Sequence, residues 1–134
     1  MILLLLSIAI KAQERLGFDE LYENTGVLGL SFSQKVKSLS NKKVVIDGFM
    51  APPLKVGANF FVLTKAPMAL CPFCSSDTDW SEDILVVYLK KRQIFVQHNA
   101  IIQVKGVLEY GSWTDNESGF VSLLRLRDAV FEEK

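Results

Sequence analysis

The chain has 134 residues, of which 49% are hydrophobic and 22% charged, a composition typical of one folded domain with a core. Intrinsic disorder is excluded on these values, because disordered chains have fewer apolar and more charged residues. Fifteen Lys and Arg balance fifteen Asp and Glu. A global positive field that would hold nucleic acid is therefore absent, and we expect no nucleic-acid partner.

Residues 1–10 form an apolar run that is too short to span a bilayer as a helix, which needs about 20 residues. We therefore expect no stable transmembrane span. The run resembles the apolar part of a secretory signal, and residues 11–13 fit a processing site. No basic residue precedes it, so the segment is a truncated signal or an element packed into the core. The pattern favours a signal peptide over residues 1–13 and an exported, periplasmic protein.

Residues 14–24 place Phe18, Leu21 and Tyr22 at helical spacing among acidic residues, which predicts a short amphipathic helix. Residues 31–43 are polar and indicate a linker or a loose helix. We therefore assign residues 14–41 to an N-terminal helix and linker, and residues 42–134 to a β-barrel domain.

From residue 43 onward the apolar pattern has a period of two. Val44, Ile46 and Met50 share one face of the first expected strand, whereas residues 84–89 are continuously apolar, as in a strand buried on both faces. A polar hairpin loop that carries Trp113 is expected over residues 111–118. The five expected strands cover residues 43–50, 59–64, 84–89, 101–110 and 119–131. They predict a mainly β fold, a small five-stranded OB-like barrel after a short N-terminal helix, with a β-sandwich as the alternative.

The connection over residues 66–83 holds both cysteines of the chain, as Cys71-Pro72-Phe73-Cys74. Two thiols at this spacing can form a disulfide, exchange with another disulfide, or supply half of a metal site. Exchange at Cys71, resolved by Cys74, has the weaker support. Polar turn residues follow the motif where a redox centre needs a helix, and carboxylates nearby raise the pKa of a thiol.

A metal site would be zinc or another transition metal, and zinc usually takes four ligands. Cys71 and Cys74 supply two, His98 is the only histidine of the chain, and Asp77 or Asp79 could add an oxygen. The alternative for His98 is a solvated turn. Further residues that could take part, as a soft copper ligand or as walls of a groove, are Met68, Phe73, Trp80 and Trp113. The third interpretation of the cysteines is a disulfide that only shapes the loop.

Several short motifs resemble an uncharacterised family of small exported bacterial proteins, known as a domain of unknown function. The matching stretches are residues 16–21 (Leu-Gly-Phe-Asp-Glu-Leu), 48–54 (Gly-Phe-Met-Ala-Pro-Pro-Leu), 60–64, Cys71, 104–108 and 126–132. Where that family has Cys-x-His and prolines, this chain has a second cysteine, Cys74. The resemblance implies export and a small β-rich fold, with no established activity.

These features predict an exported, non-enzymatic binding or accessory protein of the bacterial envelope. Its partner would be an envelope transport system for a metal or small ligand, held at the Cys71–Cys74 loop. Two alternatives stay open: a thiol-disulfide redox protein that uses the same motif, and a structural or interaction domain with a loop disulfide.

Overall fold

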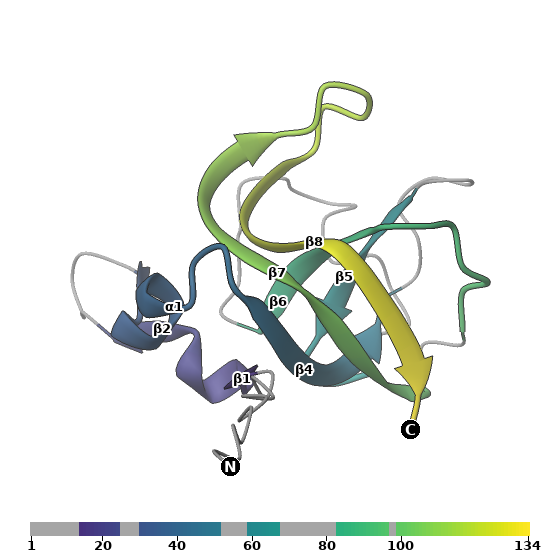
Figure 1. Ribbon diagram of the computed structural model, residues 1–134, viewed down its shortest axis with the longest axis horizontal. Helices are drawn as coiled ribbons and strands as arrows, with labels where there is room; N and C mark the ends of the chain where they lie inside the picture. The colour runs from purple at the N-terminus through teal and green to yellow at the C-terminus, as the bar shows by residue number, and fades with distance from the viewer. Residues whose placement is uncertain (1–13, 25–29, 52–58, 68–82, 97–98) are drawn as a thin grey trace, which may run out of the picture.

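The computed structural model describes residues 14–24, 30–51, 59–67, 83–96 and 99–134 (Figure 1). Within these residues no helix is long and apolar enough to cross a membrane. The elements in chain order are β1 (Glu14–Arg15), the 3-10 turn η1 (Phe18–Glu20), β2 (Tyr22–Asn24), β3 (Leu30–Phe32), α1 (Gln34–Ser38), β4 (Lys43–Met50), β5 (Phe60–Thr64), β6 (Ile84–Leu89), β7 (Ile101–Thr114) and β8 (Val121–Glu133).

The main sheet has six strands in the order β1-β4-β5-β6-β8-β7, and β7 pairs in addition with β4. Pairing is antiparallel except between β1 and β4 and between β6 and β8. Each of β4 to β8 is thus hydrogen-bonded to a neighbour on both sides. The mainly β prediction is confirmed. The sheet has six strands where five were expected, because the two residues of β1 add a short parallel pairing to β4.

The main core lies on the inward faces of these strands, as the alternation predicted. Val44, Ile46 and Met50 of β4 are at most 1% exposed. The facing positions of β7 and β8 are equally buried, and they are Ile102, Val104, Leu108, Leu124 and Leu126.

Strands β5 and β6 are buried on both faces. Phe61 and Val87 belong to the main core, whereas Phe60 and Val86 belong to a second apolar cluster on the outward side. This explains the continuous apolar run over residues 84–89. The second cluster consists of Ala51, Phe60, Val62, Ile84 and Val86, with Tyr88 and Phe120 packed against it.

The prediction of a helix over residues 14–24 is wrong, because this stretch forms β1, the single turn η1 and β2. Gly17 has extended backbone angles, and the Glu20 carboxylate accepts a hydrogen bond from its N–H at 3.1 Å, which closes one turn only. Leu16 and Leu21, five residues apart, both reach the main core. A helix would place these two side chains on different faces, so core burial outweighs the helical pattern.

A five-residue helix, α1, lies where a linker or loose helix was expected. Ser33 begins it, since its hydroxyl oxygen accepts a hydrogen bond from the Val36 N–H at 3.1 Å. The same hydroxyl donates to the Glu20 carbonyl at 2.6 Å. One side chain therefore caps the helix and fastens it to η1. The domain boundary between residues 41 and 42 stays a prediction.

The β7–β8 hairpin is longer than expected and strongly curled (Figure 1). Its register shifts between Tyr110 and Trp113, where Gly111 has a φ of +103° that favours glycine. Pairing then resumes, so Trp113 lies in β7 and not in a loop, which corrects the loop expected over residues 111–118. The turn itself follows Thr114, where the Asp115 N–H donates to the Phe120 carbonyl.

Gly48 provides a test of the packing between β4 and β5. A Cβ at this position would lie 2.8 Å from the Thr64 carbonyl oxygen and 2.9 Å from Leu63 Cγ. We expect Gly48→Ala to lower the free energy of unfolding by about 2 kcal/mol, because backbone cannot yield as a flexible side chain can. Urea denaturation followed by circular dichroism measures this.

Gly17→Ala is the matched control for this substitution. A Cβ there would meet only the end of the Glu20 side chain, at 3.2 Å. We expect a change within about 0.5 kcal/mol. Equal effects of the two substitutions would show that close packing at Gly48 does not limit stability.

Candidate functional site

Of the site residues predicted from the sequence, only Trp113 lies in the part of the chain that the structure describes. The others lie outside the described residues: Met68, Cys71, Phe73, Cys74, Asp77, Asp79, Trp80 and His98. Two described regions bear on function, namely the point where the cysteine segment joins the sheet and the outward face of β6 and β8.

The two ends of the cysteine segment are fixed at one point of the sheet. Thr64 pairs with Ile84 at the end of the β5–β6 ladder, and the Lys65 N–H donates to the Asp83 carbonyl at 3.0 Å. Thr64 Oγ1 also lies 2.6 Å from the Ala66 carbonyl oxygen. The connection between β5 and β6 therefore leaves the sheet and returns to it at the same place.

A small polar hollow of about 130 Å³ lies beside this point. Lys65 Nζ lies 2.6 Å from Asp19 Oδ1, on the turn η1. The hollow thus combines an ammonium group with carboxylates from two segments far apart in the chain, which suits a small polar or charged group. Its lining residues are Phe18, Asp19, Tyr22, Lys65 and Asp83. Within the described residues, no three His, Cys, Asp or Glu side chains form a metal-binding group.

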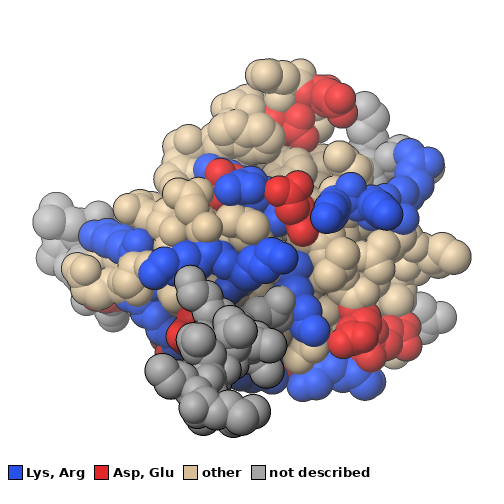
Figure 2. Space-filling model, in the orientation of Figure 1, with Lys and Arg blue, Asp and Glu red and all other residues tan. Residues whose placement is uncertain are grey.

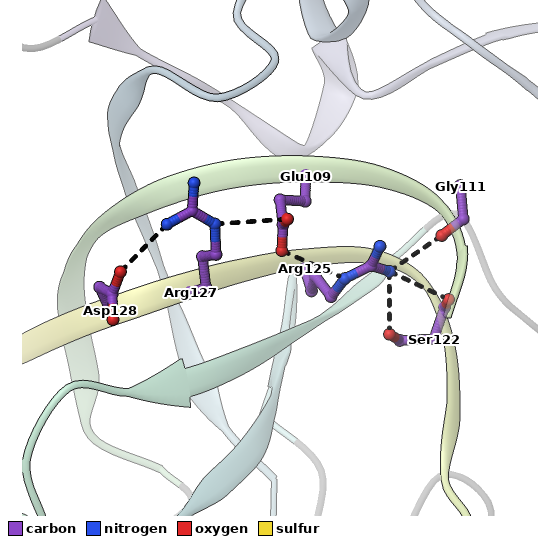
Figure 3. Close-up of polar contacts among 6 residues, drawn as sticks. All are labelled: Glu109, Gly111, Ser122, Arg125, Arg127 and Asp128. Atoms are coloured by element: carbon purple, nitrogen blue, oxygen red, sulfur yellow. Dashed lines mark hydrogen bonds and ion pairs between the residues drawn. The ribbon is translucent and has the colours of Figure 1, made fainter. Parts of the chain in front are cut away.

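The outward face of the β7–β8 hairpin holds a buried arginine, Arg125, in a polar network (Figure 3). Its side chain is 8% exposed, and Nε lies 3.5 Å from Glu109 Oε1. Nη1 donates to the Gly111 carbonyl at 2.9 Å and contacts the carbonyl and hydroxyl oxygens of Ser122, each at 3.2 Å. The guanidinium therefore bridges both strands of the hairpin at the Gly111 bulge.

Aromatic side chains border the same guanidinium. It lies over the Trp113 ring, 5.4 Å from the centroid, and Tyr88 meets Trp113 edge to face at 5.3 Å. Burial raises the pKa of Tyr88 above its ordinary value of 10.0, and the nearby Asp115 carboxylate raises it further, while Arg125 opposes both. The Tyr88 hydroxyl is buried beside the Asp115 carboxylate, and it forms no well-aligned hydrogen bond with a described residue.

No local pattern in the sequence predicts that Arg125 is buried, because it alternates with Leu124 and Leu126, whose side chains enter the main core. Register supplies the reason. Arg125 pairs with Glu109 across the hairpin and with Val86 of β6, so an acidic and an apolar neighbour flank it. Trp113 then lies over it from beyond the bulge, which no local pattern reveals. In this Arg125–Trp113 cluster, Trp113 is 43% exposed and the Glu109 side chain 32% exposed.

No family model matches the chain, and no curated protein matches it. Its fold is similar to a crystal structure of a DUF3299 family protein from Pseudomonas aeruginosa PAO1. The TM-score is 0.63 over 92% of this chain and 97% of that chain, at 13% sequence identity. That identity supports a shared fold alone. The similarity agrees with the expected relation to a domain of unknown function, whereas export stays a prediction.

The role of Arg125 can be tested by Arg125→Met. This change removes the hydrogen bonds to two carbonyls and leaves Glu109 without its more buried partner, so we expect a loss of about 2–4 kcal/mol in unfolding free energy. Arg127→Met is the matched control, since Arg127 contacts the same Glu109 at 3.3 Å but is 41% exposed. It should cost at most about 1 kcal/mol. Similar losses in both variants would contradict a special role for Arg125.

The raised pKa of Tyr88 predicts a stability loss at alkaline pH. Below pH 10 the phenol is protonated in both states, so its contribution is unaffected there. Above pH 10, the Tyr88 phenol releases its proton in the unfolded chain but retains it in the folded chain, so the folded state loses stability. Tyr88→Phe should reduce the fall in urea midpoint between about pH 9 and pH 11, relative to the control Tyr110→Phe. An unchanged fall in Tyr88→Phe would refute the assignment.

Proposed function

We propose that this protein is an exported binding or accessory module of the bacterial envelope, which holds a metal or small ligand at its cysteine segment. The observation that carries the proposal is the anchoring of both ends of that segment, by Lys65 and Asp83, beside a polar hollow. Long loops on a rigid scaffold commonly carry binding residues. Here the scaffold is the β5–β6 ladder, which is buried on both faces.

The strand pairings support an OB-like barrel as that scaffold. From β4 they run through β5, β6, β8 and β7 and return to β4, with a parallel step between β6 and β8. An OB fold is a five-stranded, partly open barrel whose second and third strands and adjoining loops form the common ligand face. In this chain β5 and β6 hold those positions, and the cysteine segment joins them.

The chemistry of the segment favours a soft or borderline cation. Cys71 and Cys74 provide two thiolates, and Asp83 at the base of the segment offers a carboxylate, whereas Asp19 is paired with Lys65. Such a ligand set suits zinc delivered to, or received from, an envelope transport system. No chemical step is required of a carrier, which agrees with the non-enzymatic interpretation.

Native mass spectrometry tests the proposal on protein purified from an exporting host without reductant or chelator. We expect a bound metal that is lost on acidification, and we expect Cys74→Ser to lose it as well. Ser76→Ala serves as the control, because it alters the same segment without removing a thiol. The control should retain the metal.

Two outcomes would contradict the metal proposal. A protein two hydrogens lighter, with no metal adduct, would establish a Cys71–Cys74 disulfide. Rapid alkylation of the reduced protein by iodoacetamide near neutral pH would then favour thiol exchange, since a reactive cysteine needs a depressed pKa. Slow alkylation would leave a structural disulfide.

A further inference from the structure

Two arginines of β8 hold one carboxylate between them, apart from the cysteine segment. Arg125 Nε lies 3.5 Å from Glu109 Oε1, and Arg127 Nε lies 3.3 Å from Glu109 Oε2. Each guanidinium therefore turns the same edge toward Glu109. A guanidinium carries several N–H groups besides the one on Nε, so most donors of both arginines are left for other partners.

Arg125 is held rigidly, yet one of its nitrogens has no partner. Nη1 contacts the Gly111 carbonyl at 2.9 Å and two oxygens of Ser122 at 3.2 Å. No described residue accepts a hydrogen bond from Nη2, and Nη2 is not among the fully buried atoms that lack one, so it reaches the surface. A fixed guanidinium with one exposed edge is preorganised to donate to a ligand, because little side-chain entropy remains to be lost on binding.

Arg127 presents a second free nitrogen beside the first. Its Nη1 donates to Asp128 Oδ2 at 3.0 Å, whereas its Nη2 has no hydrogen bond with a described residue. In Figure 3, the nitrogens of Arg125 and Arg127 that carry no dashed line point to the same side, with Glu109 between the two arginines. This arrangement suits an oxyanion, since phosphate and carboxylate oxygens accept hydrogen bonds from several guanidinium N–H groups at once.

Positive charge exceeds negative charge around these nitrogens. Glu109 faces both arginines, whereas Asp128 contacts Arg127 alone and is 61% exposed, so water screens it. Lys43 lies in the same row of the sheet as Arg127, across Val107, and it forms no ion pair with a described residue. Figure 2 shows Lys and Arg side chains gathered in a band over α1 and β4. An anion that approaches the two arginines therefore meets a net attraction.

Trp113 adds an apolar wall beside Arg125. The guanidinium carbon of Arg125 lies 5.4 Å from the centroid of the Trp113 ring, and 43% of Trp113 is exposed. An exposed indole can pack against a second ring or an aliphatic group and gain more than the buried area alone provides. The pair favours a ligand whose oxyanion is attached to such a group.

We propose that Arg125, Arg127 and Trp113 form a binding site for a small oxyanion, a phosphate or a carboxylate, that is attached to an aromatic or other apolar group. Glu109 is a positioning residue, because it orients both guanidiniums through their Nε edges and leaves their Nη2 nitrogens to the ligand. The site shares no residue with the cysteine segment, so it stands or fails separately from the metal proposal above.

Titration of the full 134-residue chain with phenyl phosphate, followed by nitrogen–proton NMR spectroscopy, tests this site. We expect saturable shifts, in the millimolar range, of the Nε–H signals of Arg125 and Arg127 and of the indole N–H signal of Trp113. Inorganic phosphate should bind about fivefold more weakly, because it cannot pack against Trp113. Benzoate and acetate, titrated in the same way, decide which of the two oxyanions the site prefers.

Arg127 is the arginine to change, because Arg125 also supports the fold. Arg127→Gln should weaken the binding of phenyl phosphate about tenfold, since a charge-assisted hydrogen bond is lost. Arg15→Gln is the matched control, because Arg15 is likewise exposed and paired with a carboxylate, that of Asp47. It should change the affinity by at most about twofold. Asp128→Asn should strengthen binding, because it removes a carboxylate that competes for Arg127.

Equal weakening in Arg127→Gln and Arg15→Gln would reduce the effect to net charge and overturn the proposal. Shifts that do not saturate with either phenyl phosphate or benzoate would overturn it as well. Trp113→Leu should abolish the preference for phenyl phosphate over inorganic phosphate while phosphate itself still binds. If that preference persisted in Trp113→Leu, the assignment of the apolar wall would be wrong. Circular dichroism confirms that each variant is folded.

Discussion

The parallel pairing of β6 with β8 is the constraint on which the rest of this structure depends. It joins the β4–β5–β6 meander to the β7–β8 hairpin at the end opposite to the β4–β7 pairing, through three residue pairs, and one of them places Val86 of the second apolar cluster beside the buried Arg125. Without it, β6 and β8 would each present an unpaired edge to solvent. The hairpin of β5 and β6 would then be joined to the rest of the sheet only by the two residue pairs between β4 and β5. The ladder also brings Val87 and Leu126 together as a pair, and both belong to the main core.

Non-local pairing of this kind also limits how much of the fold can be predicted from the sequence. Period-two alternation correctly placed the strands and their inward faces, since Val44, Ile46 and Ile102 need only local information to be assigned. It failed over residues 14–24, where Leu16 and Leu21 contact a core built by strands far along the chain. The local helical spacing of Phe18, Leu21 and Tyr22 was real, but tertiary burial outweighed it. The parallel ladder itself has no local signature.

The candidate sites were harder to predict from the sequence than the strands were. The cysteine motif was visible because its chemistry resides in the residue types themselves. The polar hollow beside its base was not, because Asp19 and Lys65 meet only after η1 packs near the end of β5. Arg125 looked like an ordinary solvent-facing residue, and its burial arises from register across the hairpin and from the bulge at Gly111. Partners that come from distant segments cannot be inferred from spacing.

The outward side chains of β5 and β6 differ in polarity and burial from those of β4 and β7. On β5 and β6 the outward side chains are apolar and buried, so that face is a second core which holds the cysteine segment's attachment rigid. On β4 and β7 the outward side chains are mixed: Lys43 is exposed, Lys105 and Val107 are half-buried, and Val45 is buried, so charged groups on that face contribute little to folding. Arg125 lies at the border between them. Its countercharge, Glu109, is shared with the more exposed Arg127, so one carboxylate neutralises the buried arginine and also contacts an arginine at the surface.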